Sequence, residues 1–285
     1  LCEGSVQEVM DLSAVAHLAT IESRVPFINF FDGFRTSHEY QKIEVINDED
    51  MRPLINQKAL SEFRARALSP EHPVARGMAE NPETFFAHRE SCNPYYDAVP
   101  AIVEKYMNEL SKITGREYKL FTYYGAEDAD RVIIAMGSVT EAAREAIDYL
   151  NANGQKVGMV SVHLYRPFSI KHLLAAIPQT AKRIAVLDRT KEPGADGEPL
   201  YLDVRSAFYG TDRNPLIVGG RYGLGSADTT PTMIISVFDN LALPQPKDHF
   251  TLGIVDDVTF TSLPLEEEKA LGGEGIFEAK FYGLG

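Results

Sequence analysis

An apolar run near the start of the chain ends in a group of polar side chains. Residues 27–31 (FINFF) are rich in β-forming side chains and are too few for a buried helix, so the pattern predicts a central parallel strand. Asp32 and Gly33 then give a turn signal. Thr36 and Glu39 have the spacing of a capping box, which predicts that a helix begins here.

The polar residues after this turn are the candidate site. They are Arg35, Thr36, Ser37, His38 and Glu39. Open α/β sheets usually bind ligands at the carboxyl ends of their strands, so this position makes the five residues candidates for lying close to an active site. A plainer interpretation stays open, in which Thr36 caps a helix, Arg35 pairs with a carboxylate and His38 is a surface residue.

Two longer helices are predicted before residue 119, besides the helix start at Thr36, a short helix at residues 59–67 and a helix start at Asn81 and Pro82. The first begins at Ser5, which forms a capping box with Glu8, and its apolar positions recur at helical period through residue 19. The second is longer: Asn93 and Pro94 give its start, apolar side chains on one face follow from residue 99 to 113, and Gly115 ends it.

The second half of the chain alternates short apolar strands with helical segments. Strands are predicted at residues 131–136, 156–164, 183–187 and 216–218. A helix is predicted from 141 to 153, with Ser138 and Glu141 as a capping box. This alternation predicts an α/β fold with parallel sheets covered by helices on both faces. After residue 244 the pattern is irregular and indicates a connecting arm.

A glycine-rich stretch follows the strand at 216–218. Its glycines and arginine, which are Gly219, Gly220, Arg221, Gly223 and Gly225, precede a helix start and could hold an anion. The stretch matches neither the dinucleotide fingerprint nor the P-loop. A tight packing turn or an inter-domain contact is the alternative.

Composition narrows the class of protein. A length of 285 residues suggests two domains, and a net charge of −13 argues against nucleic acid or an anionic membrane as partner. No apolar run approaches the ~20 residues that cross a bilayer. The two cysteines, Cys2 and Cys92, favour a reducing cytoplasm, form no metal-type spacing and cannot supply one four-thiolate iron–sulfur cluster. We therefore expect no metal site in this chain.

Several stretches together resemble one enzyme family. Residues 4–45 and 63–90 are similar to the first domain of pyruvate:ferredoxin (or flavodoxin) oxidoreductase, also called pyruvate synthase. The motifs YRPFS at 165–169, GGRYGLGS at 219–226 and FYGLG at the end extend the resemblance through the chain. The chain begins without Met and ends on an apolar segment, so both ends look cut and we expect a fragment of a longer polypeptide.

The resemblance implies three domain assignments. Residues 1–119 correspond to the C-terminal part of a pyrimidine-binding-type domain of a thiamine enzyme. Residues 120–276 correspond to a transketolase C-terminal-like domain with its connecting arm, and residues 277–285 correspond to the truncated start of a third domain. The family's catalytic residues align upstream of Leu1, so none is transferred to this chain, and the fragment alone is expected to be inactive.

Enzymes of this family decarboxylate pyruvate oxidatively to acetyl-CoA and CO2. The resemblance implies thiamine diphosphate with Mg, [4Fe-4S] clusters and coenzyme A in the full-length protein, with none expected to bind the fragment alone. It implies ferredoxin or flavodoxin as electron acceptor, the remaining domains of the same polypeptide as partners, and a homodimer. A related oxidoreductase for another 2-oxoacid, and a non-catalytic assembly module, remain alternatives.

Overall fold

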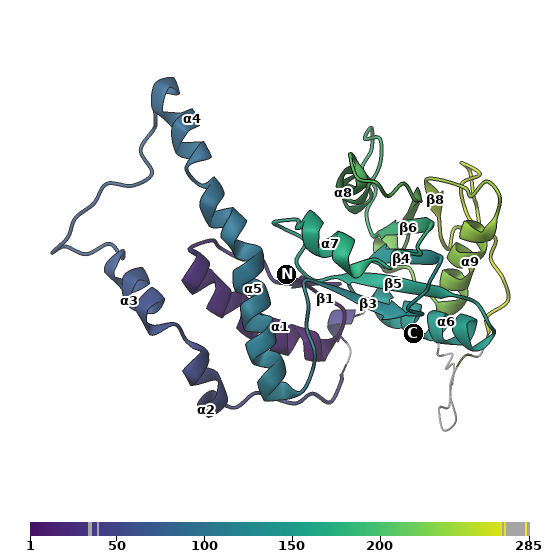
Figure 1. Ribbon diagram of the computed structural model, residues 1–285, viewed down its shortest axis with the longest axis horizontal. Coiled ribbons are helices and arrows are strands. Elements are labelled where there is room, and N and C mark those ends of the chain that lie inside the picture. The colour runs from purple at the N-terminus through teal and green to yellow at the C-terminus, as the bar shows by residue number, and fades with distance from the viewer. Residues whose placement is uncertain (34–35, 39, 270, 272–282, 284–285) are drawn as a thin grey trace.

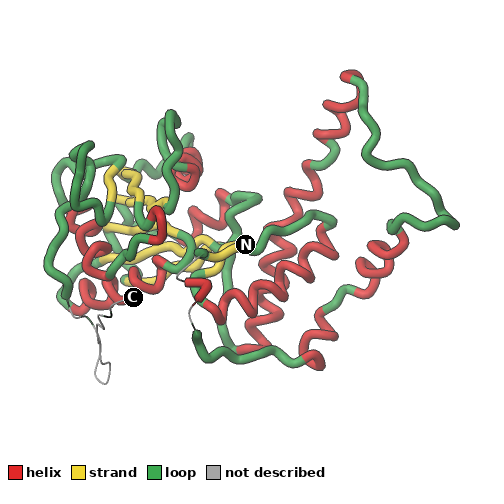
Figure 2. Tube along the Cα trace, turned by 180° about the vertical axis from the view of Figure 1, so that it is seen from behind, coloured by secondary structure: helices red, strands yellow, loops and turns green. Residues whose placement is uncertain are grey.

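The fold is taken from a computed structural model that describes residues 1–33, 36–38, 40–269, 271 and 283. Helices from the first 114 residues lie beside a sheet built from the rest of the chain (Figures 1 and 2). The first group of elements is β1 (Cys2–Glu3), α1 (Val6–Ser23), β2 (Phe30–Phe31), η1 (Thr36–His38), α2 (Asp48–Met51), η2 (Arg52–Leu54), α3 (Gln57–Ala65), α4 (Pro82–Glu90) and α5 (Asn93–Thr114).

Six strands form the larger sheet, in the order β3-β5-β4-β6-β7-β8. Its elements are β3 (Phe121–Gly125), β4 (Arg131–Ala135), α6 (Val139–Ala152), β5 (Val157–Val162), α7 (Ile170–Ala176), β6 (Arg183–Asp188), α8 (Pro199–Phe208), β7 (Leu216–Arg221), η3 (Leu224–Ser226), α9 (Pro231–Ala242) and β8 (Phe250–Thr251). All neighbouring strands pair in parallel except β3, which runs antiparallel to β5. The predicted parallel α/β sheet is therefore confirmed, with one antiparallel edge strand added.

Helices cover both faces of this sheet. α6 and α9 pack together on one face, whereas α7 and α8 lie on the other. Alternate residues of β4 divide between the two faces: Ile133 belongs to the core under α6 and α9, and Ile134 to the core under α7 and α8. Both side chains are completely buried. The near-continuous apolar strands of the sequence thus reflect burial on both sides.

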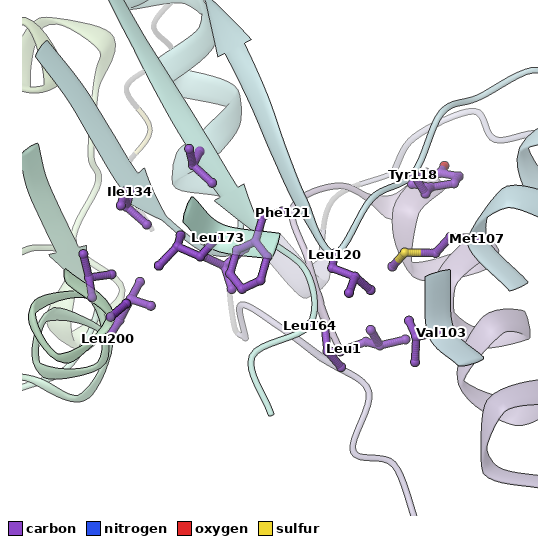
Figure 3. Packing of buried hydrophobic residues seen from close by; sticks show 14 of the residues in the cluster. Leu1, Val103, Met107, Tyr118, Leu120, Phe121, Ile134, Leu164, Leu173 and Leu200 are labelled. Carbon is purple, nitrogen blue, oxygen red and sulfur yellow. The ribbon is translucent and has the colours of Figure 1, made fainter. Parts of the chain in front are cut away.

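The helices α1 and α5 share a core with the sheet. Ser5 caps α1 by accepting a hydrogen bond from the Glu8 amide at 3.2 Å, as predicted, and Gly115 ends α5 in a left-handed conformation. Figure 3 shows Met107 of α5 beside Tyr118 and Val103 beside Leu1, with Leu120 leading into the first strand of the sheet. One continuous apolar cluster therefore joins the two parts of the chain.

The predicted central strand at residues 27–31 is wrong. Only Phe30 and Phe31 are in strand conformation, and β2 pairs in parallel with β1 alone. The two phenyl side chains are 36% and 44% exposed, and Ile28 is 79% exposed. Among the described residues no other strand lies beside β2, so its apolar side chains have nothing to pack against on the outer side.

Residues 48–98 form an extended arm of short helices. None of these residues is buried, although α3 and α4 form close to where helices were predicted. Figure 1 shows α4 continuing from one end of the long α5 and α3 standing apart from α5, both away from the sheet. Large apolar side chains of the arm are solvent-exposed, among them Phe63, Leu68, Met78, Phe85 and Phe86.

Candidate functional site

The carboxyl edge of the six-stranded sheet carries a cleft of about 810 Å³. The chain leaves β4 toward β5 on one side and returns to β6 on the other, so the sheet has its topological switch point between β4 and β6. Doubly wound sheets bind ligands at this place. The cleft is lined from β2 and from the ends of β4, β6 and β7, by residues that include Phe30, Phe31, Asp32, Met136, Gly137, Tyr165, Asp188, Arg189, Thr190, Lys191, Tyr222 and Gly223.

Asp32 reaches the switch point from the other part of the chain. One carboxylate oxygen, Oδ2, accepts a hydrogen bond from the backbone N–H of Ser138 at the start of α6. The other, Oδ1, lies 2.8 Å from Nη1 of Arg189, the first residue after β6. The carboxylate therefore occupies the positive end of a helix and an ion pair at the same time.

This arrangement replaces the predicted capping box of α6. The side chain of Ser138 makes no cap hydrogen bond, and its backbone already has helical dihedral angles. The exposed N–H of Ser138 is instead satisfied by Asp32, which is 106 positions away in the sequence. The prediction of a local cap by Ser138 and Glu141 is wrong because a distant carboxylate takes that position.

A second carboxylate of the site, that of Asp188 at the end of β6, is buried. Asp188 is 3% exposed, and its two oxygens accept hydrogen bonds from the backbone N–H groups of Leu200 and Tyr201, each at 3.0 Å. Burial raises the pKa of Asp188 to about 6, against the lowering effect of these two hydrogen bonds. Asp188 therefore acts as the cap of α8.

The basic side chains that line the cleft already have carboxylate partners. Arg189 pairs with Asp32, and Nζ of Lys191 lies 3.7 Å from Oε1 of Glu198. Glu198 also lies 3.4 Å from Nη1 of Arg221. The positive charge of the cleft is thus balanced by the chain itself, which argues against a phosphate site in this arrangement.

Two weakly acidic side chains border the cleft in neutral form. Burial, followed by the nearby charge of Asp32, raises the pKa of the Tyr222 hydroxyl, which donates to the carbonyl oxygen of Met136 at 3.3 Å. Burial also raises the pKa of the Cys2 thiol, which is 3% exposed. A thiol in this state is a poor nucleophile.

The predicted cluster at residues 35–39 is described only in part. Arg35 and Glu39 lie outside the described residues. Thr36, Ser37 and His38 form the single 3-10 turn η1 in place of the predicted α-helix start. Ser37 and His38 are exposed, with Oγ of Ser37 3.2 Å from Nδ1 of His38, and neither residue lines the cleft.

The glycine-rich stretch divides between a strand and a turn. Gly219, Gly220 and Arg221 belong to β7, which extends three residues beyond its predicted end. Gly223 and Gly225 have positive φ angles and form the turn that borders the cleft. The carbonyl oxygen of Gly223 accepts a hydrogen bond from Nε of Arg189 at 3.0 Å.

Neither a metal site nor a membrane span is found in the described residues. These residues contain no group of three or more His, Cys, Asp or Glu side chains that could hold a metal ion. None of the described helices combines the length and apolar character that crossing a membrane requires.

The sequence does not indicate Asp32 as a site residue. Asp32 and Gly33 form only a turn signal, and the partners of Asp32, Ser138 and Arg189, lie more than 100 positions away.

Two family models match the chain. The one described as "Pyruvate flavodoxin/ferredoxin oxidoreductase, thiamine diP-bdg" matches residues 1–108, and the one described as "Pyruvate:ferredoxin oxidoreductase core domain II" matches residues 129–234. The class that they define is that of thiamine-diphosphate-binding oxidoreductases.

Curated relatives match over the whole chain. This chain is 60% identical over 286 residues to "Pyruvate-flavodoxin oxidoreductase" of Enterobacter agglomerans. It is 56% identical over 285 residues to "Pyruvate:ferredoxin oxidoreductase" of Moorella thermoacetica. Each match covers 100% of this chain and 24% of the relative, so the chain spans about a quarter of the relatives' length. The chain belongs to the family of pyruvate:ferredoxin and pyruvate:flavodoxin oxidoreductases.

A solved structure is similar at a lower level. 2-Oxoglutarate:ferredoxin oxidoreductase from Magnetococcus marinus aligns with a TM-score of 0.39 and 22% identity, covering 61% of this chain and 28% of that chain.

Proposed function

We propose that this chain is part of an enzyme that oxidatively decarboxylates pyruvate, transfers the acetyl group to coenzyme A and reduces ferredoxin or flavodoxin. The observation that carries the proposal is the 60% identity to a pyruvate-flavodoxin oxidoreductase over the whole chain. The matches of the two family models, one to residues 1–108 and one to residues 129–234, also support it.

The residues that the structure describes do not by themselves fit thiamine diphosphate with its metal ion. The described residues hold no metal-binding group, and the basic side chains of the largest cleft are paired with carboxylates. A diphosphate needs unpaired donors and a divalent cation. We therefore propose that the remaining parts of the enzyme supply the diphosphate site and the [4Fe-4S] clusters.

The proposed division of the chain follows its two kinds of structure. Residues 1–119 are assigned to the pyrimidine-binding-type domain, 120–276 to a transketolase C-terminal-like domain and 277–285 to the start of a third. The change from long helices to an alternating sheet after α5 supports the first boundary. Within the enzyme, the role proposed for this part is structural, with the cluster at residues 35–39 close to the active site.

Partners and location are proposed on the same basis. The relatives are named for flavodoxin and ferredoxin, which we propose as electron acceptors here, together with a homodimeric assembly. Both cysteines are free thiols, which supports a reducing, cytoplasmic location.

The test is an anaerobic assay of the full-length protein that contains this chain. Pyruvate- and coenzyme A-dependent viologen reduction is expected, and it should be lost when thiamine diphosphate is removed and restored when it is added back. A panel of other 2-oxoacids run in parallel defines the substrate. Absence of reduction with pyruvate, combined with turnover of another 2-oxoacid, would overturn the assignment of substrate.

A further inference from the structure

We propose that the switch point of the six-stranded sheet is a carboxylate-binding site whose ligand is the chain's own Asp32, which makes Asp32 a positioning residue for the segment that follows it. The place where a doubly wound sheet ordinarily binds an external ligand then serves to join two parts of one chain. The kinetic consequence of this inference rests on the proposed function, whereas its structural consequence does not.

Both oxygens of the Asp32 carboxylate are bound, each by a different element. Oδ2 takes the N–H of Ser138 at the start of α6, and Oδ1 takes the guanidinium of Arg189 at 2.8 Å. The side chain is only 12% exposed. A charged donor and a helix N-terminus acting on one carboxylate give a stronger contact than either one alone.

The backbone at the site leaves room for the carboxylate and for little else. Gly137, directly before Ser138, has a φ of +84°, and a Cβ atom placed there would lie 2.6 Å from Oδ2 of Asp32. Any larger residue at position 137 would therefore displace the carboxylate as well as strain the backbone. A glycine at this position permits the close approach of the ligand.

The cation at the site is itself fixed. Nε of Arg189 donates to the carbonyl oxygen of Gly223 at 3.0 Å, while its Nη1 meets Asp32. The turns after β4, β6 and β7 therefore all contribute to holding one carboxylate. Such a preorganised pair of donors loses little conformational entropy when it binds its ligand.

Removal of the Asp32 carboxylate leaves the positive charge of Arg189 without its partner. Without the Asp32 carboxylate, Arg189 and the N-terminus of α6 form an uncompensated positive pocket in a protein of net charge −13. A small monovalent carboxylate such as formate matches the group that is lost in size, charge and geometry. The pocket of an Asp32→Ala variant is therefore expected to bind formate.

The contact also fixes the start of the segment that leads from β2 to η1. Asp32 directly follows β2, and η1 starts four positions later at Thr36. Among the described residues β2 pairs only with the two-residue strand β1, so the side chain of Asp32 adds a direct contact from the end of β2 to the turns after β4 and β6. Removing it is expected to misplace Thr36, Ser37 and His38, the described residues of the cluster proposed to lie near the active site.

The experiment uses the full-length protein and three variants: Asp32→Ala, Arg189→Ala and the double variant. Asp32→Ala is expected to speed hydrogen exchange at residues 136–141, to lower Tm, and to lower kcat by about tenfold or more through misplacement of neighbouring groups. Sodium formate should reverse these changes in Asp32→Ala, whereas sodium chloride at equal ionic strength should not. In the double variant formate should have no effect.

A control separates carboxylate binding from general stabilisation. Leu241→Ala removes a completely buried side chain of α9 that does not line the cleft, and its lowered Tm should not respond to formate beyond the chloride control. Unchanged exchange in Asp32→Ala, or exchange that formate fails to slow, would overturn the inference. Exchange and Tm respond whether or not pyruvate is the substrate, so failure of the proposed function is a separate result.

Discussion

The sheet of residues 121–251 and the arm of residues 48–98 are built from similar proportions of apolar side chains but bury them very differently. In the sheet, strands and helices cover each other and side chains such as Ile133 and Phe238 are completely buried. In the arm, no residue is buried, and Phe86 on α4 is 73% exposed. The sheet therefore contains its own packing partners, whereas the arm does not.

This difference teaches that a helical pattern does not specify where a helix packs. The nine-residue helices α3 and α4 are shorter than the ~12–15 residues at which isolated helices become marginally stable in water. Exposed apolar side chains such as those of α3 and α4 often mark a surface that another part of a protein covers. The chain spans 24% of the length of a curated relative, so other parts of the full-length protein are candidates for covering them. The comparison predicts a large loss of stability in the sheet and a small one in the arm for the same kind of substitution.

The largest effect is expected from truncating a core phenylalanine. Phe238→Ala should lower the free energy of unfolding by about 3–5 kcal/mol, because it removes a completely buried ring and leaves a cavity. The matched variant Phe86→Ala should change it by less than about 0.5 kcal/mol. Urea denaturation followed by circular dichroism measures both, and comparable losses would contradict the distinction between sheet and arm.

The next largest effect is expected on the pH dependence of stability, through a buried carboxyl group at the contact between the two parts of the chain. Glu3 in β1 is 1% exposed, neither carboxylate oxygen has a hydrogen-bond partner among the described residues, and burial raises its pKa to about 8. The folded state therefore binds this proton more tightly than the unfolded state, so stability falls as pH rises from about 4.5 to 8. Glu3→Gln should abolish this fall and add about 3 kcal/mol at pH 7.

The measurement for Glu3 is a series of urea denaturation curves between pH 4 and pH 8.5. The wild type and Glu3→Gln should be equally stable near pH 4 and should diverge as pH increases. A constant difference across the range would mean that the amide changes packing and that the carboxyl proton is not involved.

A smaller effect is expected from adding one methyl group inside the sheet. Gly220 in β7 faces the ring of Phe250, and a Cβ atom there would lie 2.2 Å from a ring carbon, so Gly220→Ala should cost about 1–3 kcal/mol through overpacking. Gly33→Ala is the matched control, since no heavy atom lies within 4 Å of its added Cβ. The pair is compared by the shift in Tm, and an equal shift would refute the packing argument.

The smallest perturbation is a single cut by trypsin. Arg76 lies in the exposed loop between α3 and α4, where the backbone has few contacts, so trypsin should cut there before it cuts at Arg131 or Arg183 in the sheet. Mass spectrometry should show fragments 1–76 and 77–285 first. The same digestion of the full-length protein measures how far its other parts cover the arm, and early cutting within β4 or β6 would reverse the comparison.

Local patterns predicted much of the fold. The cap of α1 at Ser5, the end of α5 at Gly115 and the parallel strands β4 to β7 follow from contacts within a few residues or from burial on both faces. Neighbouring positions carry this information, and it is therefore visible in a single sequence.

The features that the sequence did not reveal depend on distant partners. Residues 27–31 predict a central strand because apolar content does not specify how many strands lie alongside, and in the part of the chain that the structure describes β2 has one neighbour, β1. The α6 cap was assigned to Ser138 from spacing alone, whereas Asp32 supplies the acceptor. The same holds for the candidate site. The sequence pattern points to residues 35–39, after the turn, whereas the residue that contacts the switch point is Asp32, within the turn.

The contact of β1 with the sheet has a consequence for synthesis on the ribosome. The N–H of Cys2 donates to the carbonyl oxygen of His163 at 2.8 Å, which joins positions 161 residues apart. At elongation rates of roughly 5–20 residues per second, the nascent chain carries Cys2 for roughly 10 to 30 s before its partner exists. During that interval, apolar side chains such as Phe30 and Phe31 have only local neighbours, and they are candidates for recognition by chaperones that act on nascent chains.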